Sequence, residues 1–289
     1  ATLHVDLDLD RLVGGLLDAH NLLVDDPRYL LGQFNAYLAQ TLLLQADEAF
    51  WSGDKAQIGK LKGLISSDVQ MIEHKGVDPI KVRNYVRLMV TSNEDWVVPA
   101  GRDERRWCVI DVKDNRAQDA DYFGRLVDHF RSDKHRGGLL HYLQTWRLDG
   151  TDLRTIPRTR GLFEQKVRSF DPVEAWWFER LQEGAQLPGD AWREEVARHR
   201  LVAAYSTEAE RVGIRRRGTQ TELGIALQRL TPSLGTVRRY DVEEDKRVRF
   251  WRFPPLEACR RWFEAAVGQS IEWEDVAVEE AGRPGDRDD

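Results

Sequence analysis

Carboxylate and amide side chains follow two apolar runs of this chain, in an arrangement that suits phosphate chemistry. The run at 42–46 (LLLQA) leads into Asp47 and Glu48, and the run at 85–91 is followed by Asn93. Such runs are typical of buried parallel strands, and open α/β sheets bind ligands at the carboxyl edge of their strands. We therefore expect Asp47 to hold Mg²⁺, Glu48 to polarise the water that attacks a nucleoside triphosphate, and Asn93 to orient that water.

The usual phosphate-binding loop is missing from the sequence. No G-x-x-x-x-G-K-[ST] motif occurs, so no lysine can be assigned to the nucleotide phosphates. The only upstream candidate, residues 1–20, carries Asp6, Asp8 and Asp10 where a triphosphate needs amide dipoles and a cation. Either the chain begins within or after the nucleotide loop of a longer protein, or it is a version that has lost the loop.

Composition narrows the class of protein. The chain has 289 residues, of which 41% are hydrophobic and 32% charged, as expected of a globular protein with about two domains. Its two cysteines, Cys108 and Cys259, lie far apart and predict neither a disulfide framework nor a zinc site. Apolar runs are far shorter than the roughly 18–20 residues that cross a bilayer, so we expect no membrane association and a reducing, cytoplasmic setting.

Charge is distributed unevenly. The net charge is −6, yet residues 191–262 contain 16 Arg and Lys against 10 Asp and Glu, whereas residues 271–289 contain 8 acidic and 2 basic residues. This pattern predicts a basic, DNA-binding module followed by an acidic, disordered tail.

The periodicity predicts an α/β sheet followed by a helical region. We expect a helix at 55–66, a β-hairpin at 69–82 around Lys75-Gly76, and helical structure from 119 to 146. Strands of the parallel sheet are expected at 42–46, 86–91 and 107–112. A further helix at 173–181 contains Trp176 and Trp177, which we expect to be core residues.

The region after Pro188 predicts a winged helix. Its expected elements are helices at 192–207 and 219–230, a two-stranded wing at 236–240 and 247–252, and a final helix through 266. Three arginines, Arg215, Arg216 and Arg217, precede the second helix, where they would contact DNA phosphates.

Several motifs in order resemble those of a known family. They are GQFNAYL at 32–38, ADEAFWSGDK at 46–55, IEHKGVD at 72–78, TSNEDWVVPA at 91–100 and DERR at 103–106. Together they resemble the helicase half of phage and plasmid primase-helicases, a branch of the superfamily 3 helicases with an AAA+-like ATPase core.

This resemblance implies a role for each matching residue. Asp47 and Glu48 are similar to the Mg²⁺-binding and general-base pair, and Asn93 to the sensor 1 residue. Arg105 or Arg106 resembles the arginine finger that reaches a neighbouring subunit's site. Lys75 resembles the basic hairpin residue that grips single-stranded DNA in a central channel.

The resemblance also implies an architecture and partners. The implied architecture comprises a partial ATPase core at 1–150, a helical connector at 151–189, a winged-helix-like DNA-binding domain at 190–268 and the tail at 269–289. The implied ligands are Mg²⁺ and ATP. The implied assembly is a homo-oligomeric ring, a hexamer, with single-stranded DNA in its channel and duplex at the winged helix, in a bacterial host cell, phage or mobile element.

Other interpretations remain open. Arg105 and Arg106 are equally compatible with surface ion pairs, Lys75 with an ordinary turn residue, and 215–217 with a solvated charge run. The histidines show no ligand-like spacing. The chain is alternatively a non-catalytic DNA-binding or assembly subunit that has lost nucleotide hydrolysis, or, less favoured, a purely structural oligomerisation module.

Overall fold

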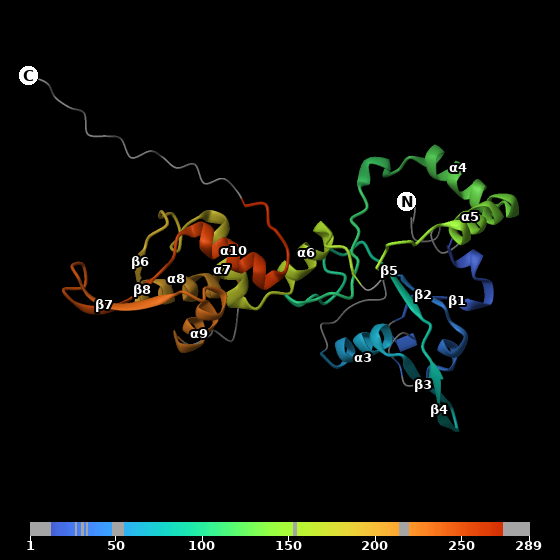
Figure 1. Ribbon diagram of the computed structural model, residues 1–289, viewed down its shortest axis with the longest axis horizontal. Helices are drawn as coiled ribbons and strands as arrows, with labels where there is room; N and C mark the ends of the chain where they lie inside the picture. The colour runs from blue at the N-terminus through green and yellow to red at the C-terminus, as the bar shows by residue number, and fades with distance from the viewer. Residues whose placement is uncertain are drawn as a thin grey trace, which may run out of the picture. The chain divides into compact units, whose positions relative to one another are not determined.

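A computed structural model describes residues 13–26, 28–29, 32, 34–47, 55–152, 155–213 and 220–273. The chain forms two compact units, one of residues 1–100 and 104–168, the other of residues 101–103 and 169–289. The described part is mixed α/β, with one parallel three-stranded sheet and two antiparallel sheets (Figure 1).

The parallel sheet is the centre of the first unit. Its strands are β1 (Asn21–Val24), β2 (Leu43–Asp47) and β5 (Arg87–Thr91), in the order β1-β2-β5. The strands expected at 42–46 and 86–91 are confirmed, whereas β1 was not predicted. The first four residues of β2 are buried, as expected of a central parallel strand that is covered on both faces.

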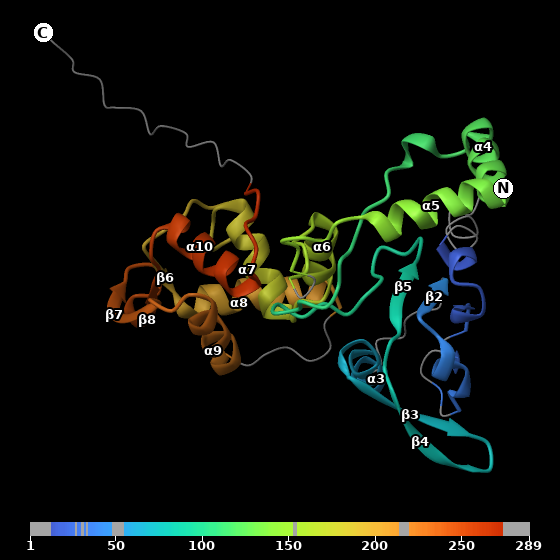
Figure 2. The ribbon, with the colours of Figure 1, turned by 45° about the vertical axis from the view of Figure 1, so that its right-hand side comes forward.

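Between β2 and β5 the chain forms a helix and a hairpin. Helix α3 (Lys55–Ser66) has the predicted bounds, and β3 (Val69–His74) pairs antiparallel with β4 (Val77–Arg83). Gly76 has φ +77°, a backbone conformation that glycine adopts without the steric cost of a side chain. Figure 2 shows the hairpin extending away from the parallel sheet.

The prediction of a strand at 107–112 is wrong. Within the described residues this segment pairs with no strand. Trp107 and Val109 pack against the core of the first unit, but Ile110 and Val112 are 75% and 77% exposed. The apolar, β-branched run therefore packs on one side without pairing, because β propensity describes a half-buried surface and does not ensure a pairing partner.

Helices complete the first unit. The helical structure expected at 119–146 is divided at Ser132, whose extended backbone (ψ 119°) separates two helices. The helices are α4 (Ala120–Arg131), α5 (Asp133–Thr145) and α6 (Arg160–Arg168), with short 3₁₀ turns at Gly14–Leu16, Asp18–His20, Ala36–Gln40 and Asp114–Arg116.

The second unit combines helices with an antiparallel sheet. Its strands β6 (Glu195–Ala197), β7 (Gly235–Asp241) and β8 (Lys246–Arg252) have the order β6-β8-β7. Its helices are α7 (Pro172–Glu183), α8 (Arg198–Arg211), α9 (Gln220–Leu230) and α10 (Leu256–Val267). The expected two-stranded hairpin is present, and it gains β6 as a third strand because residues 195–197 are extended where a helix was expected.

Aromatic side chains form the core of the second unit. Trp176 and Trp177 are 3% and 0% exposed, so their expected packing role is confirmed. The Trp177 ring stacks on Phe253 at a centroid distance of 5.6 Å. Asp171 and Glu174 form a reciprocal capping box that fixes the start of α7.

Some expectations fall on residues outside the described part, namely Glu48, Arg215, Arg216, Arg217 and most of the tail. Among the described residues, no helix combines the length and apolar character needed to cross a bilayer.

The packing of the second unit predicts a large difference in thiol reactivity. Cys259 is fully buried in α10, and burial raises its pKa to about 12, so almost none of it is thiolate at pH 8. Cys108 is exposed. We expect a thiol reagent at pH 8 to modify one cysteine in the native chain and two in denaturant.

The matched control is Cys108→Ser, which we expect to show no fast-reacting thiol until the second unit unfolds. Rapid modification of native Cys108→Ser chains would contradict this packing.

Candidate functional site

The carboxyl ends of β2 and β5 meet at one edge of the parallel sheet. Asp47, the last residue of β2, is in register with Thr91, the last residue of β5. The Thr91 hydroxyl donates a hydrogen bond to Asp47 Oδ1 over 3.1 Å. This bond orients a half-buried carboxylate at the sheet edge, where ligands of open α/β sheets bind.

The segment after β5 carries the predicted amide. Asn93 lies two residues beyond Thr91, in an exposed bend. The continuing loop is held by Gln165 of α6, whose Oε1 accepts from the backbone N–H groups of Val97 (2.7 Å) and Val98 (3.1 Å). Gln165 also donates to the Asp95 carbonyl over 2.8 Å. One buried side chain thus fixes the path of the chain after Asn93.

The structure distinguishes the two candidate arginines. Glu104, 6% exposed, accepts hydrogen bonds from the backbone N–H groups of residues 105 and 106. Its carboxylate pairs with the Arg106 guanidinium at 3.1 Å. The same guanidinium also donates a hydrogen bond to the Ser66 hydroxyl at the end of α3. Arg105 is exposed, and its guanidinium has no hydrogen bond or ion pair among the described residues. Arg106 therefore braces the loop, and Arg105 is available to a ligand.

Lys75 lies in the exposed turn of the β3–β4 hairpin. Asn35 anchors this hairpin to the preceding segment, since its side chain donates to the Met71 carbonyl (3.0 Å) and accepts from the Glu73 N–H (2.8 Å). Asn84 ties the base of the hairpin to α3 through the Leu64 carbonyl at 2.7 Å. The turn is thus exposed while its base is firmly held.

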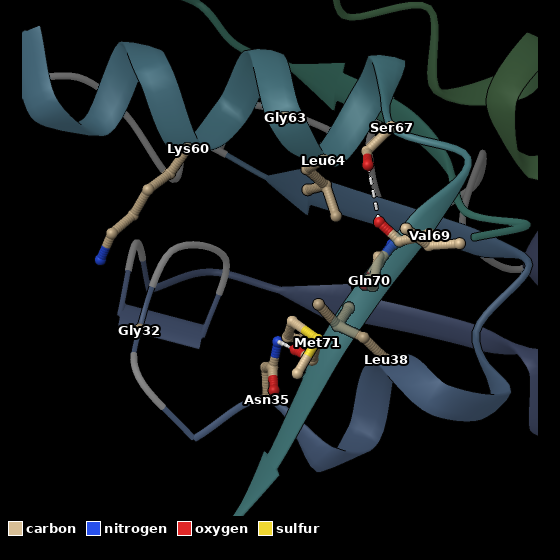
Figure 3. Close-up of a pocket in the computed structure, with 10 residues that line it drawn as sticks. All are labelled: Gly32, Asn35, Leu38, Lys60, Gly63, Leu64, Ser67, Val69, Gln70 and Met71. Carbon is tan, nitrogen blue, oxygen red and sulfur yellow. Dashed lines mark hydrogen bonds between the residues drawn. The ribbon is translucent and has the colours of Figure 1, made fainter. Parts of the chain in front are cut away.

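A pocket of about 280 Å³ lies between α3, β3 and the segment that contains Asn35 (Figure 3). Leu38, Leu64 and Met71 contribute apolar walls, and Gln70 is among its polar residues. Asp47, Thr91 and Asn93 do not line it. The pocket is consequently separate from the sheet edge on which the predicted chemistry depends.

The donor set at the sheet edge fits a divalent cation in part. Asp47 Oδ1 is occupied by Thr91, and Oδ2 accepts no hydrogen bond among the described residues. A free carboxylate oxygen is the type of ligand that Mg²⁺ prefers. The second predicted carboxylate, Glu48, lies outside the described residues, as do the predicted DNA contacts Arg215, Arg216 and Arg217.

Sequence reasoning missed the residues that position this site. The sequence marks Thr91 only as a strand end and the first residue of the motif at 91–100, and it places Gln165 within the helical connector. Their partners are 44 and 68 residues away in the chain, respectively. Asn35 was noted only as part of a motif. A polar residue at an otherwise apolar strand end was the one available signal for Thr91.

Comparison with known proteins gives a partial match to a family. A model described as a family of unknown function, DUF5906, matches residues 6–106, which include the parallel sheet, α3 and the hairpin. A search of curated proteins returned no match.

Solved structures share the fold over most of the chain. The apo structure of the NrS-1 C terminal region (305-718) has a TM-score of 0.60 at 15% identity, over 86% of this chain and 64% of that chain. The A form apo structure of the same region has a TM-score of 0.59 at 14% identity and the same coverage. The chain thus spans 64% of the length of these structures, and at such identities the likeness concerns the fold alone.

The contacts of Gln165 predict a local effect of its replacement. In Gln165→Leu the N–H groups of Val97 and Val98 lose their acceptor inside the protein, which costs roughly 1–3 kcal/mol. Since 1.36 kcal/mol is a factor of ten, we expect hydrogen exchange at these two amides to accelerate about tenfold or more. Exchange within β2 should not change.

Gln144→Leu is the matched control, because Gln144 is exposed on α5. Equal exchange rates at Val97 and Val98 in the two variants would show that Gln165 does not hold the loop.

Proposed function

We propose that this chain is a DNA helicase or translocase module of a phage- or plasmid-type replication protein, with ATP hydrolysed at subunit interfaces. The observation that carries the proposal is the shared edge of β2 and β5, where Asp47 accepts a hydrogen bond from Thr91. Asn93 follows Thr91 by two residues in the chain. The order of motifs, which resembles that of primase-helicases, supports it. The fold likeness to the NrS-1 C terminal region supports the architecture only.

In this proposal each residue at the edge has a separate task. Asp47 offers its free carboxylate oxygen to Mg²⁺, which would neutralise charge on the phosphates when bound. Glu48 accepts a proton from the attacking water, and Asn93 orients that water toward the γ-phosphate. The hydroxyl of Thr91 keeps the Asp47 carboxylate in position.

Arg105 is the proposed arginine finger. A finger must extend from its own subunit, and a guanidinium already held by its own chain is not free to do so. Arg106 is held by Glu104 and Ser66, whereas Arg105 is exposed. Arg105 would enter the site of a neighbouring copy, which requires the homo-oligomeric ring, a hexamer, that the resemblance implies.

Contacts with DNA are proposed in both units. Lys75, on the exposed hairpin turn, would follow the backbone of a single strand in the channel of the ring. In the second unit, the succession of α7, β6, α8, α9 and the β7–β8 hairpin supports a winged-helix-like interpretation. There, Arg215, Arg216 and Arg217 before α9 would contact duplex phosphates.

A specific observation favours a second candidate. The sequence lacks the glycine-rich loop and lysine that cradle nucleotide phosphates. The alternative is therefore a non-catalytic, helicase-like subunit that binds DNA or assembles with a partner without hydrolysing ATP.

The proposed finger predicts a loss of turnover without a loss of binding. We expect Arg105→Ala to lower the kcat of Mg²⁺-dependent ATP hydrolysis by about 10³–10⁵, the range seen for other arginine fingers. Arg131→Ala, which removes an exposed arginine of α4, is the control and should retain activity.

Asp47→Asn should abolish both hydrolysis and Mg²⁺-dependent nucleotide binding. A wild-type chain that neither binds nor hydrolyses ATP would reject the enzyme and favour the alternative.

A site shared between subunits also predicts complementation. Chains with Asp47→Asn lack the metal ligand, and chains with Arg105→Ala lack the finger, so a mixed ring contains some interfaces with both groups intact. We expect hydrolysis to reappear when the two inactive variants are mixed. If the mixture stays inactive although each variant assembles, Arg105 does not act on a neighbouring copy.

A further inference from the structure

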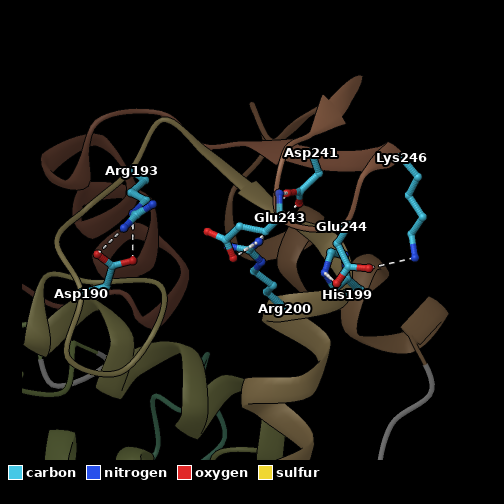
Figure 4. A network of polar contacts seen from close by, with 8 residues as sticks. All are labelled: Asp190, Arg193, His199, Arg200, Asp241, Glu243, Glu244 and Lys246. Carbon is cyan, nitrogen blue, oxygen red and sulfur yellow. Dashed lines mark hydrogen bonds and ion pairs between the residues drawn. The ribbon is translucent and has the colours of Figure 1, made fainter.

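Each acidic residue at the tip of the β7–β8 hairpin contacts a neighbour within the second unit, and Figure 4 shows these contacts for Asp241, Glu243 and Glu244. Arg200 of α8 contacts Asp241 at 3.4 Å and Glu243 at 2.7 Å. Glu244 pairs with Lys246 at 2.8 Å and lies 3.3 Å from His199. The fourth acid, Asp245, accepts from the Tyr240 hydroxyl. The negative charge of the tip is therefore engaged inside the unit.

The arginines of the same hairpin fall into two groups. Arg239 and Arg252 pair with Glu195 of β6, at 3.1 Å and 2.8 Å. The other three, Arg238, Arg247 and Arg249, are exposed, and none has an ion pair or hydrogen bond through its guanidinium among the described residues. Three cations of this hairpin thus have no acidic partner within the described part of the chain.

Strand register gathers these three arginines on one face. Arg238 is directly opposite Arg249, and Arg247 is opposite Tyr240, two residues along β8 from Arg249. Residues two apart on a strand share a face, and directly opposite residues have Cβ atoms about 4.5–5.5 Å apart. Like charges directly opposite each other destabilise a sheet. An anion on this face would relieve that repulsion.

The same face packs on the helices at the base of the hairpin. Trp251 is the next residue on this face of β8, and its ring lies under the Arg198 guanidinium of α8 at 4.8 Å. A Cβ on Gly224 of α9 would stand 3.5 Å from the Trp251 ring. The three arginines therefore lie on the same face of the hairpin as Trp251, and this face is directed toward α9.

We propose that Arg238, Arg247 and Arg249 form a phosphate-binding face that holds the backbone of duplex DNA beside α9. The proposal rests on the proposed function only in that the second unit binds DNA. Guanidinium groups bind phosphate oxygens bidentately, and such contacts position a duplex without reading its sequence. The hairpin strands, and not its acidic tip, meet the DNA.

Salt dependence of binding tests this face. The full chain and its variants are titrated against a fluorescent duplex of arbitrary sequence at NaCl concentrations between 50 and 200 mM. The test variant carries Arg238→Gln, Arg247→Gln and Arg249→Gln. The control removes the same charge from paired arginines, with Arg193→Gln, Arg239→Gln and Arg252→Gln. Protection of Cys259 from thiol reagents verifies that each variant is folded.

We expect the test variant to bind at least tenfold more weakly at 50 mM salt than the control. The slope of log affinity against log salt should fall by about 2.7, because each phosphate contact contributes roughly 0.9. Replacing the same three arginines with lysine should preserve most of the slope, since the charge is kept.

The outcomes separate this inference from the proposed function. Equal slopes for the test and control variants would overturn the inference while DNA binding by the second unit stands. The inference would also be overturned, with DNA binding by the second unit intact, if the slope changed only when Arg215, Arg216 and Arg217 were neutralised. A wild-type chain without salt-sensitive DNA binding would overturn both.

Discussion

The parallel pairing of β2 with β5 is the constraint on which the candidate site depends. It brings the ends of two segments 44 residues apart to one edge, and the Thr91–Asp47 hydrogen bond closes that pairing at its last position. Parallel strands need a long crossover, and here the crossover contains α3 and the β3–β4 hairpin. Asn84 ties the base of this hairpin to α3 and to the residue before β5, at the opposite end of β5 from Thr91.

Elements with clear periodicity and punctuation were predictable from the sequence. The bounds of α3 and the hairpin turn at Lys75-Gly76 follow from a polar helical pattern and a glycine that adopts positive φ. The prediction of a strand at 107–112 failed because its apolar, β-branched residues pack on one side only, which a single sequence does not distinguish from strand pairing. β1 and β6 were missed because strands of four and three residues carry too short a pattern.

The candidate site was predictable at the strand ends and nowhere else. Asp47 and Asn93 follow apolar runs, so their placement at the edge of a sheet follows from strand direction. The role of Gln165 depends on tertiary contacts, which have no local signal, whereas Glu104 contacts its own neighbours, residues 105 and 106. The sequence likewise shows that residues 191–262 are basic, but only the ion pairs separate Arg239, which is neutralised by Glu195, from Arg238, which is not.

Mn²⁺ with ATP offers the most direct test of the shared edge, because Mn²⁺ substitutes for Mg²⁺ and broadens the nuclear magnetic resonance signals of nearby groups. We predict that saturating Mn²⁺ and ATP broaden the amide signals of Asp47, Thr91 and Asn93 together, and that Asp47→Asn removes this broadening. Signals at these three positions that stay sharp in the wild-type chain, or that broaden equally in Asp47→Asn, would contradict a nucleotide-bound metal at this edge.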